Sequence, residues 1–203
     1  MEKNTKPIKD HINDFLDWID VEKGLSTKTQ ENYKRFLDRF LFWLKKANLE
    51  ALLPHRLTPE HIWDFRLFLS RKKDYKGKYL KKTSQSYYLR ALRNLLNYFA
   101  DKDIVSIPSD KIKLPKLTDK DKKIKFLKFE QIEKLLSTPG DKGRVALRDR
   151  AILEALFSSG MRVSELTSLN IKQFNLKNLL NNKLKDSELS IAGKGGAVRT
   201  VYF

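Results

Sequence analysis

The chain has 203 residues, of which 40% are hydrophobic, so it is long enough and apolar enough to bury a core. It contains no cysteine, which excludes disulfides, thiolate zinc sites and thiol nucleophiles, and its three histidines do not favour a metal centre. Forty-two basic residues against 25 acidic ones give a formal net charge of +17, which favours a polyanionic partner such as nucleic acid. The competing explanation is a surface that uses lysine only for solubility.

The longest apolar run, Phe40–Leu44, is far shorter than the roughly 20 residues that a membrane span requires, and the N-terminus has no apolar signal region. The basic residues are spread over many segments instead of one amphipathic helix, which argues against an acidic membrane surface as the partner. We therefore expect a soluble, cytoplasmic protein that has no membrane contact and needs no metal or other cofactor.

Four segments of the first half carry hydrophobic residues at helical spacing. The first covers residues 8–19 and stops before Gly24, a helix breaker. The second begins at Ser26, whose hydroxyl suits an N-cap, and carries apolar residues from Tyr33 to Leu44. Together with the next two segments, this hydrophobic spacing predicts four amphipathic helices that pack as a small bundle.

The third and fourth segments have their own start signals. Thr58 suits an N-cap with Pro59 at the first helical position, and after a lysine-rich turn Thr83 or Ser84 suits the cap of the fourth helix. The bundle is predicted to span residues 1–107. Several aromatic residues recur at helical spacing and are expected in the core instead of stacking on bases: Tyr33, Phe36, Phe40, Trp43 and Tyr88.

The periodicity breaks between Pro108 and Lys128, a stretch with two prolines, eight lysines and three aspartates. We predict a basic linker at 108–123 and a second domain at 124–203. In that domain we first expect a helix from Phe129 that ends at Pro139-Gly140 and a helix at about 148–158 that ends at Gly160. Another helix should begin near Arg162. Two strands should follow, around Leu189–Ile191 and Val198–Phe203.

Two motifs of the second domain decide the interpretation. Residues 160–166 read GMRVSEL at a predicted helix junction, and residues 193–196 read GKGG between the two predicted strands. This pair resembles the tyrosine recombinase, or phage integrase, family of the Xer kind. Further likenesses are the GLS segment at 24–26 with Thr29 and Tyr33, the ALR segment at 91–93 and the LPK segment at 114–116.

The resemblance implies a mainly α fold. It consists of an N-terminal four-helix SAM-like core-binding domain and an incomplete α/β catalytic domain, mostly helical with a small β-sheet. The implied partner is double-stranded DNA, on which the full-length protein would assemble as a homo- or hetero-oligomer, a tetramer. In the family, a tyrosine attacks a DNA phosphodiester and leaves a 3′-phosphotyrosyl link, without ATP or another cofactor.

Three residues match the family's catalytic motifs. Arg162 would hold non-bridging phosphate oxygens in the transition state, because a planar guanidinium can bond two of them at once. Lys194 would protonate the leaving 5′-oxygen. Glu165 would orient a guanidinium as a supporting residue. Taken singly, each residue also has a non-catalytic explanation. Arg162 could be a solvated surface arginine, Lys194 an ordinary turn lysine and Glu165 a carboxylate that stabilises a helix start.

The candidates for DNA backbone contacts in the first domain are polar or basic residues of its second and fourth helices. Such contacts position a protein on DNA without reading its sequence. Ser26 serves equally well as a plain N-cap. The candidates are Ser26, Lys28, Thr29, Lys34, Arg90 and Arg93.

The chain also departs from the family pattern. The family requires a downstream His-x-x-Arg pair and a tyrosine nucleophile, yet all three histidines precede the GMRVSEL segment and none has arginine three residues later. Tyr202 lies in a predicted strand only eight residues after Lys194, so we do not assign it as the nucleophile. We expect the front portion of a longer protein, which binds DNA but cannot cleave it alone.

Three functional hypotheses follow. The first is a site-specific recombinase that resolves chromosome dimers or integrates mobile DNA. The second is a non-catalytic DNA-binding regulator derived from a recombinase. The third, a basic helical protein that binds RNA or a protein partner, is supported by charge alone.

Overall fold

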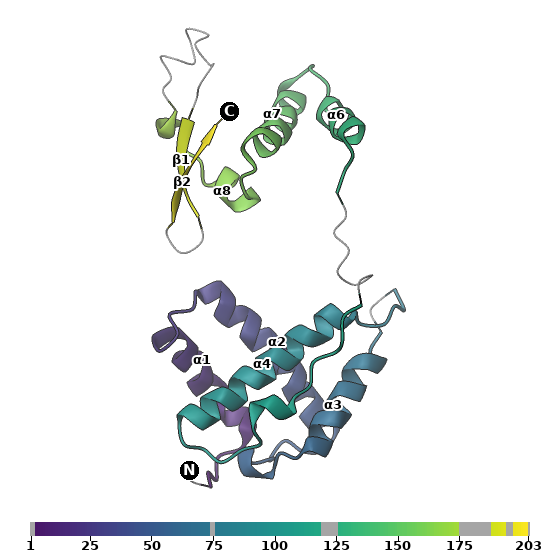
Figure 1. The fold of residues 1–203 in the computed structure, drawn as a ribbon, viewed down its shortest axis with the longest axis vertical. Helices are drawn as coiled ribbons and strands as arrows, with labels where there is room; N and C mark the ends of the chain where they lie inside the picture. Colours follow the sequence, from purple (N-terminus) through teal and green to yellow (C-terminus); the bar gives the residue numbers. More distant parts are fainter. Residues whose placement is uncertain (1–2, 74–75, 119–125, 175–187, 194–196, 203) are drawn as a thin grey trace. The chain divides into compact units, whose positions relative to one another are not determined.

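The computed structural model describes residues 3–73, 76–118, 126–174, 188–193 and 197–202. It divides into two compact units, residues 1–124 and 125–203, which are described separately (Figure 1). Within the described ranges, no helix is both long and apolar enough to cross a membrane. The mainly helical fold class expected from the sequence is confirmed.

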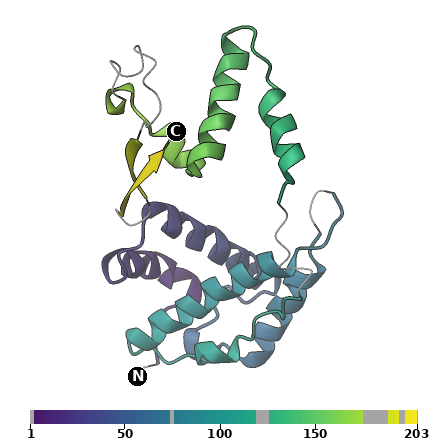
Figure 2. The ribbon, with the colours of Figure 1, turned by 45° about the horizontal axis from the view of Figure 1, so that its top comes forward.

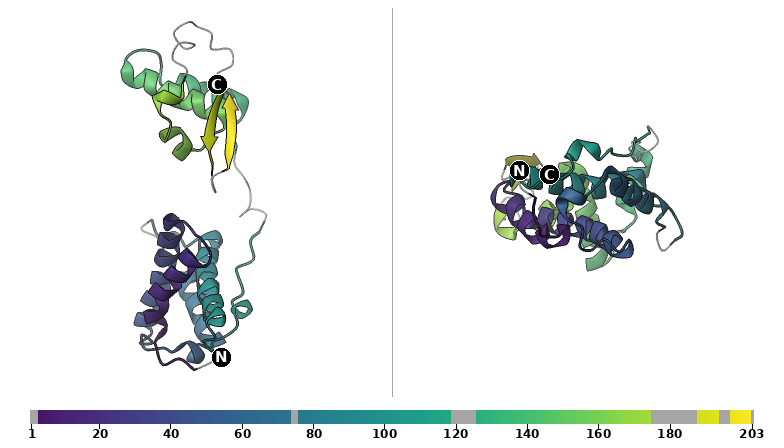
Figure 3. Two further views of the ribbon diagram at one scale, coloured as in Figure 1. Left: turned by 90° about the vertical axis from the view of Figure 1, so that its left-hand side faces the viewer. Right: turned by 90° about the horizontal axis from the view of Figure 1, so that it is seen from below.

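The first unit is a helical bundle in which α4 packs against α1, α2 and α3. The further views agree that the teal α4 lies beside the purple and blue helices (Figures 2 and 3). Short 3-10 turns at Ile8–His11, Pro54–Arg56 and Ser109–Lys111 flank the helices. The helices are α1 (Ile12–Val21), α2 (Thr27–Lys46), α3 (Pro59–Arg71) and α4 (Lys82–Asp101).

The core of this unit is rich in aromatic side chains. Phe15, Phe40, Phe65 and Phe99 are fully buried, and the Phe40 and Phe65 rings meet edge to face with centroids 5.0 Å apart. Aromatic pairs at this geometry add to the free energy gained from burial alone. The prediction that the aromatic stripe belongs to the core is confirmed: Phe40 and Trp43 are buried, while Tyr33, Phe36 and Tyr88 are partly buried against the same cluster.

The helix starts match the sequence signals unevenly. Thr58 caps α3 as predicted: its Oγ1 accepts from the His61 backbone N–H at 3.3 Å, and the Thr58 N–H donates to His61 Nδ1 at 3.2 Å. The predicted cap of α4 at Thr83 or Ser84 is wrong, because α4 already begins at Lys82. Gln85 supports this earlier start by donating its side-chain amide to the Leu80 carbonyl at 2.8 Å.

The beginning of the expected linker packs on the helical unit. A short turn follows Pro108, and the Ile112 side chain is fully buried. Arg93 Nε donates to the Ile112 carbonyl at 2.7 Å, and Leu114 contacts the edge of the same core. The chain is therefore held to the bundle as far as Leu114. Residues 119–123 of the expected linker lie outside the described residues.

The second unit combines three helices with a β-hairpin. α7 begins before the expected residue 148, directly after Gly143 at φ +88°, and ends at Gly160 in the left-handed conformation. β1 and β2 pair antiparallel with Leu189 opposite Val201. The small core consists of Met161, Leu189, Ile191 and Val201. The elements are α6 (Phe129–Ser137), α7 (Arg144–Ser159), α8 (Val163–Thr167), a 3-10 turn (Ile171–Gln173), β1 (Glu188–Ala192) and β2 (Val198–Tyr202).

We expect the second unit to open far more readily than the first. No described residue of α6 or α7 is buried, whereas α4 alone buries eight. Amides of α6 and α7 should exchange through openings of at most a few kcal/mol, against roughly 5–15 kcal/mol for global unfolding of a stable domain. Hydrogen exchange followed by mass spectrometry measures this difference. Equal protection of α7 and α4 would contradict it.

Candidate functional site

The junction between α7 and α8 places Arg162 at the start of a helix. Gly160, at φ +59°, ends α7 in a conformation that side chains other than glycine adopt reluctantly. Met161 is buried in the core of the unit, and Arg162 then occupies the N-cap of α8 with extended backbone angles. The GMR segment therefore turns the chain sharply, anchors it by one apolar side chain and presents the next residue at a helix N-terminus.

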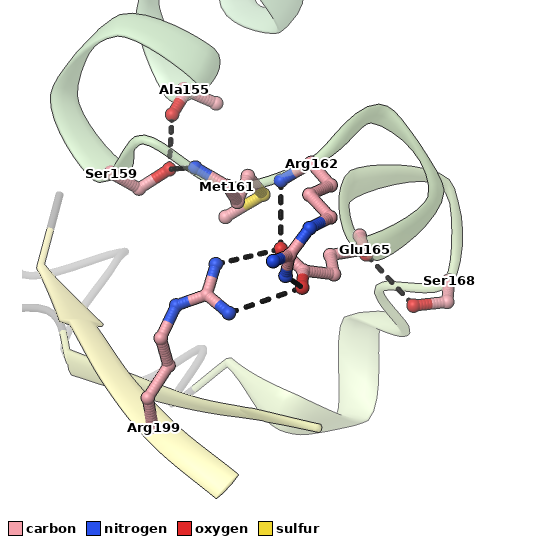
Figure 4. A network of polar contacts seen from close by, with 7 residues as sticks. All are labelled: Ala155, Ser159, Met161, Arg162, Glu165, Ser168 and Arg199. Carbon is pink, nitrogen blue, oxygen red and sulfur yellow. Dashed lines mark hydrogen bonds and ion pairs between the residues drawn. The ribbon is translucent and has the colours of Figure 1, made fainter. Parts of the chain in front are cut away.

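Glu165 holds the start of α8 together. Its Oε2 accepts from the Arg162 backbone N–H at 2.7 Å, and its Oε1 accepts from Arg162 Nη1 at 2.6 Å (Figure 4). The Glu165 side chain is only 7% exposed, so its charge is stabilised by these bonds instead of by water. The expected supporting residue thus lies against the expected catalytic arginine.

A second arginine, Arg199 on β2, reaches the same carboxylate. Its Nη1 donates to Glu165 Oε1 at 3.1 Å and its Nη2 donates to Oε2 at 2.7 Å, so both oxygens are engaged (Figure 4). Arg199 was not among the site residues predicted from the sequence. The signal was its position two residues before buried Val201, which puts both on one face of the strand. An arginine on the same face of a strand as a buried residue is a candidate for an ion pair with a nearby carboxylate, although the Arg199 side chain is also 41% exposed.

These contacts lower the pKa of Glu165 from 4.5 to about 2, chiefly through the Arg199 hydrogen bonds and then through the Arg162 backbone N–H. Because the pKa of Glu165 is depressed in the folded state, the bonds of its carboxylate to Arg199 and Arg162 contribute their full folding stability above pH 4.5. That stability is lost as the pH falls toward about 2.

We therefore expect acid to release the hairpin from α8 between about pH 4.5 and 2. Carboxyl carbon chemical shifts of Glu165, followed by NMR across this range, measure the change directly. Glu165→Gln should remove this part of the pH dependence, whereas Glu154→Gln, on an exposed ion pair of α7, should leave it in place. A Glu165 pKa near 4.5 in the folded protein would contradict the expectation.

Arg162 keeps donors available for a ligand. Its side chain is 61% exposed, and among the described residues only its Nη1 has a hydrogen-bond partner, Glu165. A guanidinium has five N–H donors, and with one of them bonded to Glu165 four remain to bind an anion. The position at a helix N-terminus adds backbone dipoles of the favourable sign. The arrangement can hold a phosphate oxygen pair, and the role of Arg162 in catalysis stays a prediction.

The hairpin glycines are described only in part. Lys194, the expected general acid, lies outside the described residues together with Gly195 and Gly196. Gly193 is described, and its N–H donates to the Ala197 carbonyl at 2.7 Å. A Cβ at Gly193 would lie 3.3 Å from both that carbonyl oxygen and Arg199 Nη1, closer than most side chains tolerate. The first glycine of the GKGG segment therefore leaves room for the Arg199 side chain.

The candidate DNA contacts of the first unit lie on two helices that pack against each other, α2 and α4. Lys34 and Arg90 are exposed, whereas Lys28 pairs with Glu31 at 2.7 Å. Arg90 and Arg93 line one hollow of about 530 Å³ together with Tyr33, whose hydroxyl accepts from the Asn94 side-chain amide.

Two of the α2 candidates contact each other. Ser26 is the N-cap of α2 by position, but its hydroxyl bonds the Thr29 hydroxyl at 3.1 Å instead of a backbone N–H. The N-cap alternative for the Ser26 side chain is therefore not seen. Whether Ser26 and Thr29 contact DNA stays a prediction.

Comparison with known families gives matches over most of the chain. Residues 11–106 match the family model described as the N-terminal SAM-like domain of phage integrase. Residues 125–203 match the model of the phage integrase family. Both units of the structure are therefore covered, each by a model of its own.

Curated relatives include the tyrosine recombinase XerD of Haemophilus influenzae, 34% identical over 92% of this chain and 57% of the relative. The tyrosine recombinase XerC of Pelobacter propionicus is 33% identical over 97% of this chain and 60% of the relative. The chain thus spans less than two thirds of the length of these relatives. Among solved structures, the XerH site-specific recombinase bound to difH substrate in a pre-cleavage complex matches with a TM-score of 0.64 and 20% identity. That match covers 100% of this chain and 66% of XerH, and it shows a shared fold.

Proposed function

Because the chain belongs to the phage integrase family of tyrosine recombinases, we propose that it supplies the DNA-binding and phosphate-holding part of a site-specific recombinase. The complete enzyme would cleave and rejoin DNA through a 3′-phosphotyrosyl intermediate. The observation that carries this proposal is the placement of Arg162, fixed at the start of α8 by Glu165 with donors to spare. Resolution of chromosome dimers and integration of mobile DNA both use this chemistry.

The need for a fixed cation follows from the negative charge that develops on the phosphate oxygens during the reaction. Attack by a tyrosine oxygen concentrates negative charge on the non-bridging oxygens, and a fixed guanidinium lowers the barrier by stabilising that charge. The two bonds from Arg162 to Glu165 support this role, because one holds the backbone at the α8 N-cap and the other holds the side chain. Lys194, next to Gly193 in the sequence, is proposed to deliver the proton to the leaving 5′-oxygen.

The helical unit is proposed to grip duplex DNA through phosphates. Its candidates Lys34 and Arg90 are exposed cations, and Arg93 lies beside Arg90 in the hollow between α4 and the Ser109–Lys111 turn. The net charge of +17 supports the same partner. The structural relative XerH is described as bound to its DNA substrate, which also supports DNA as the ligand of this fold.

We predict that the 203-residue chain retards duplex DNA but forms no covalent adduct with it. Tyr202 lies on β2 opposite Glu188, where the hairpin fixes its backbone, and the three histidines all belong to the helical unit. A nicked suicide substrate, analysed by native and then denaturing electrophoresis, tests both halves. Absence of retardation at low salt would reject the proposed function.

Tyr202→Phe is the matched variant for this experiment. We expect it to bind the suicide substrate as the unchanged chain does, with no covalent band from either protein. A covalent band that disappears in Tyr202→Phe would instead identify Tyr202 as the nucleophile. Electrostatic stabilisation without an attacking group leaves no covalent step to accelerate.

A further inference from the structure

The contact between Arg199 and Glu165 joins two elements that are far apart in sequence. Glu165 belongs to the first turn of α8, and Arg199 belongs to β2, 34 residues later. In the close view, the Arg199 side chain extends from the hairpin toward the carboxylate that also holds Arg162 (Figure 4). The Glu165 carboxylate is therefore shared by two guanidinium groups, one from the N-cap of α8 and one from β2.

The charges of the three groups show what Arg199 adds. A pair made only of Arg162 and Glu165 would be neutral, and its carboxylate would compete with a phosphate for the guanidinium. With Arg199 the three groups carry a net charge of +1, and both oxygens of Glu165 are already engaged by Arg199. The positive charge of Arg162 is thus left for an incoming anion, since Arg199 balances Glu165.

The bonding geometry gives Arg199 a second effect. Two parallel N–H···O bonds fix the plane of a carboxylate, which one bond or a lone ammonium cannot do. Each Glu165 oxygen then has a defined direction toward Arg162, Oε1 to the guanidinium and Oε2 to the backbone N–H. The position of the hairpin is therefore transmitted through Glu165 to the orientation of Arg162.

We propose that Arg199 is a positioning residue for Arg162, which acts through Glu165 to orient the guanidinium and to keep its charge available for a DNA phosphate. The inference rests on the proposed function for its ligand. The segment between β1 and β2 contains Lys194 in the sequence, so one hairpin would carry both the general acid and the residue that orients the phosphate-binding arginine.

The first test uses the free 203-residue chain and needs no DNA. In the unchanged protein, the Arg162 guanidinium nitrogens should give distinct NMR signals, because the bond to Glu165 hinders their rotation. Arg199→Gln should let these signals average. Arg199→Lys should do the same, since it keeps the charge but cannot bond both oxygens. Unchanged Arg162 signals in either variant would overturn the proposal.

A matched control comes from α7, where Arg150 pairs with Glu154 at 2.8 Å on an exposed surface. Arg150→Gln removes the same charge from the same unit without touching the cluster, and the Arg162 signals should not respond. Cross-strand contacts between Leu189 and Val201 report whether the hairpin still forms in each variant. An intact hairpin with averaged Arg162 signals separates positioning from simple loss of structure.

The second test is a double-mutant cycle in affinity for a DNA duplex. Arg162→Ala should weaken binding by only a few-fold and Arg199→Gln by about two-fold, and Arg199→Gln should have no further effect once Arg162 is alanine. The two changes should therefore be coupled by at least about two-fold, as expected for residues of one hydrogen-bonded network. Additive losses would overturn the proposal and show that Arg199 binds phosphate independently.

The two tests separate failure of this inference from failure of the proposed function. If the unchanged chain does not bind duplex DNA, the proposed function is rejected and Arg199 has no phosphate-binding residue to position, whatever the NMR signals show. If the chain binds DNA but Arg162 signals ignore Arg199, the proposed function stands and the positioning role is rejected. Averaged signals together with coupled affinities support both.

Discussion

Replacing Arg162 with alanine, in a polypeptide that also supplies the tyrosine nucleophile, is expected to slow DNA strand cleavage by about 10²–10³-fold. This corresponds to roughly 3–4 kcal/mol of lost transition-state stabilisation, the usual effect of removing one preorganised donor to a developing oxyanion. Single-turnover cleavage of a nicked suicide substrate measures the rate of this step. Binding of the same DNA should weaken little, because many other cations are expected to contact its phosphates.

The control for this experiment is Arg150→Ala on α7, which removes an arginine from the same unit but from an exposed ion pair. We expect its cleavage rate to stay near that of the unchanged protein. Equal losses in the two variants would show that net charge matters and the position of Arg162 does not. A large loss of binding with normal cleavage of the bound fraction would also contradict the assigned role.

DNA affinity is expected to fall steeply with salt. Each phosphate neutralised by a basic residue contributes a slope of roughly 0.9 in log affinity against log salt, so a clamp with about 6–10 contacts loses about 10³–10⁵ between roughly 50 and 200 mM. Fluorescence anisotropy with a labelled duplex measures this slope. A flat dependence would contradict phosphate binding, and equal affinity for an RNA duplex would favour the RNA-binding alternative.

Arg90→Gln and Lys102→Gln form a matched pair for the salt experiment. Both remove one positive charge from the same helix or its end, but Arg90 lines the candidate DNA surface, whereas Lys102 caps the far end of α4 and lies near Glu22. Arg90→Gln should reduce the slope of log affinity against log salt by roughly 0.9, the contribution of one phosphate contact. Lys102→Gln should leave the slope unchanged.

Hydrophobic spacing was a good guide to the elements of this fold, and side-chain chemistry was a poorer guide to their ends. The four helices of the first unit follow from apolar residues at helical intervals, because each buries one face against the others. The α4 start was missed since Gln85 supports it from within the helix, a contact that propensities at Thr83 and Ser84 do not reveal.

The site was predictable where a motif is local and unpredictable where it is not. Gly160, Arg162 and Glu165 lie within six residues, so helix geometry alone places the carboxylate beside the arginine. Arg199 depends on a hairpin folding back onto α8, which requires knowing both strand register and tertiary packing. The burial of Ile112 was also not predicted, since one isoleucine between polar residues shows no helical or strand periodicity and the segment was therefore assigned to the linker.

The packing of Ile112 and Leu114 on the helical bundle shortens the tether between the two units. The next helix begins at Phe129, fifteen residues after Leu114, so the connection can span at most roughly 50–55 Å when fully extended. If the bundle binds a duplex as proposed, the covalent connection keeps the other unit within this span, so a second set of phosphate contacts would form at a raised local concentration. Two weak DNA contacts joined in this way can bind with an avidity that neither unit reaches alone.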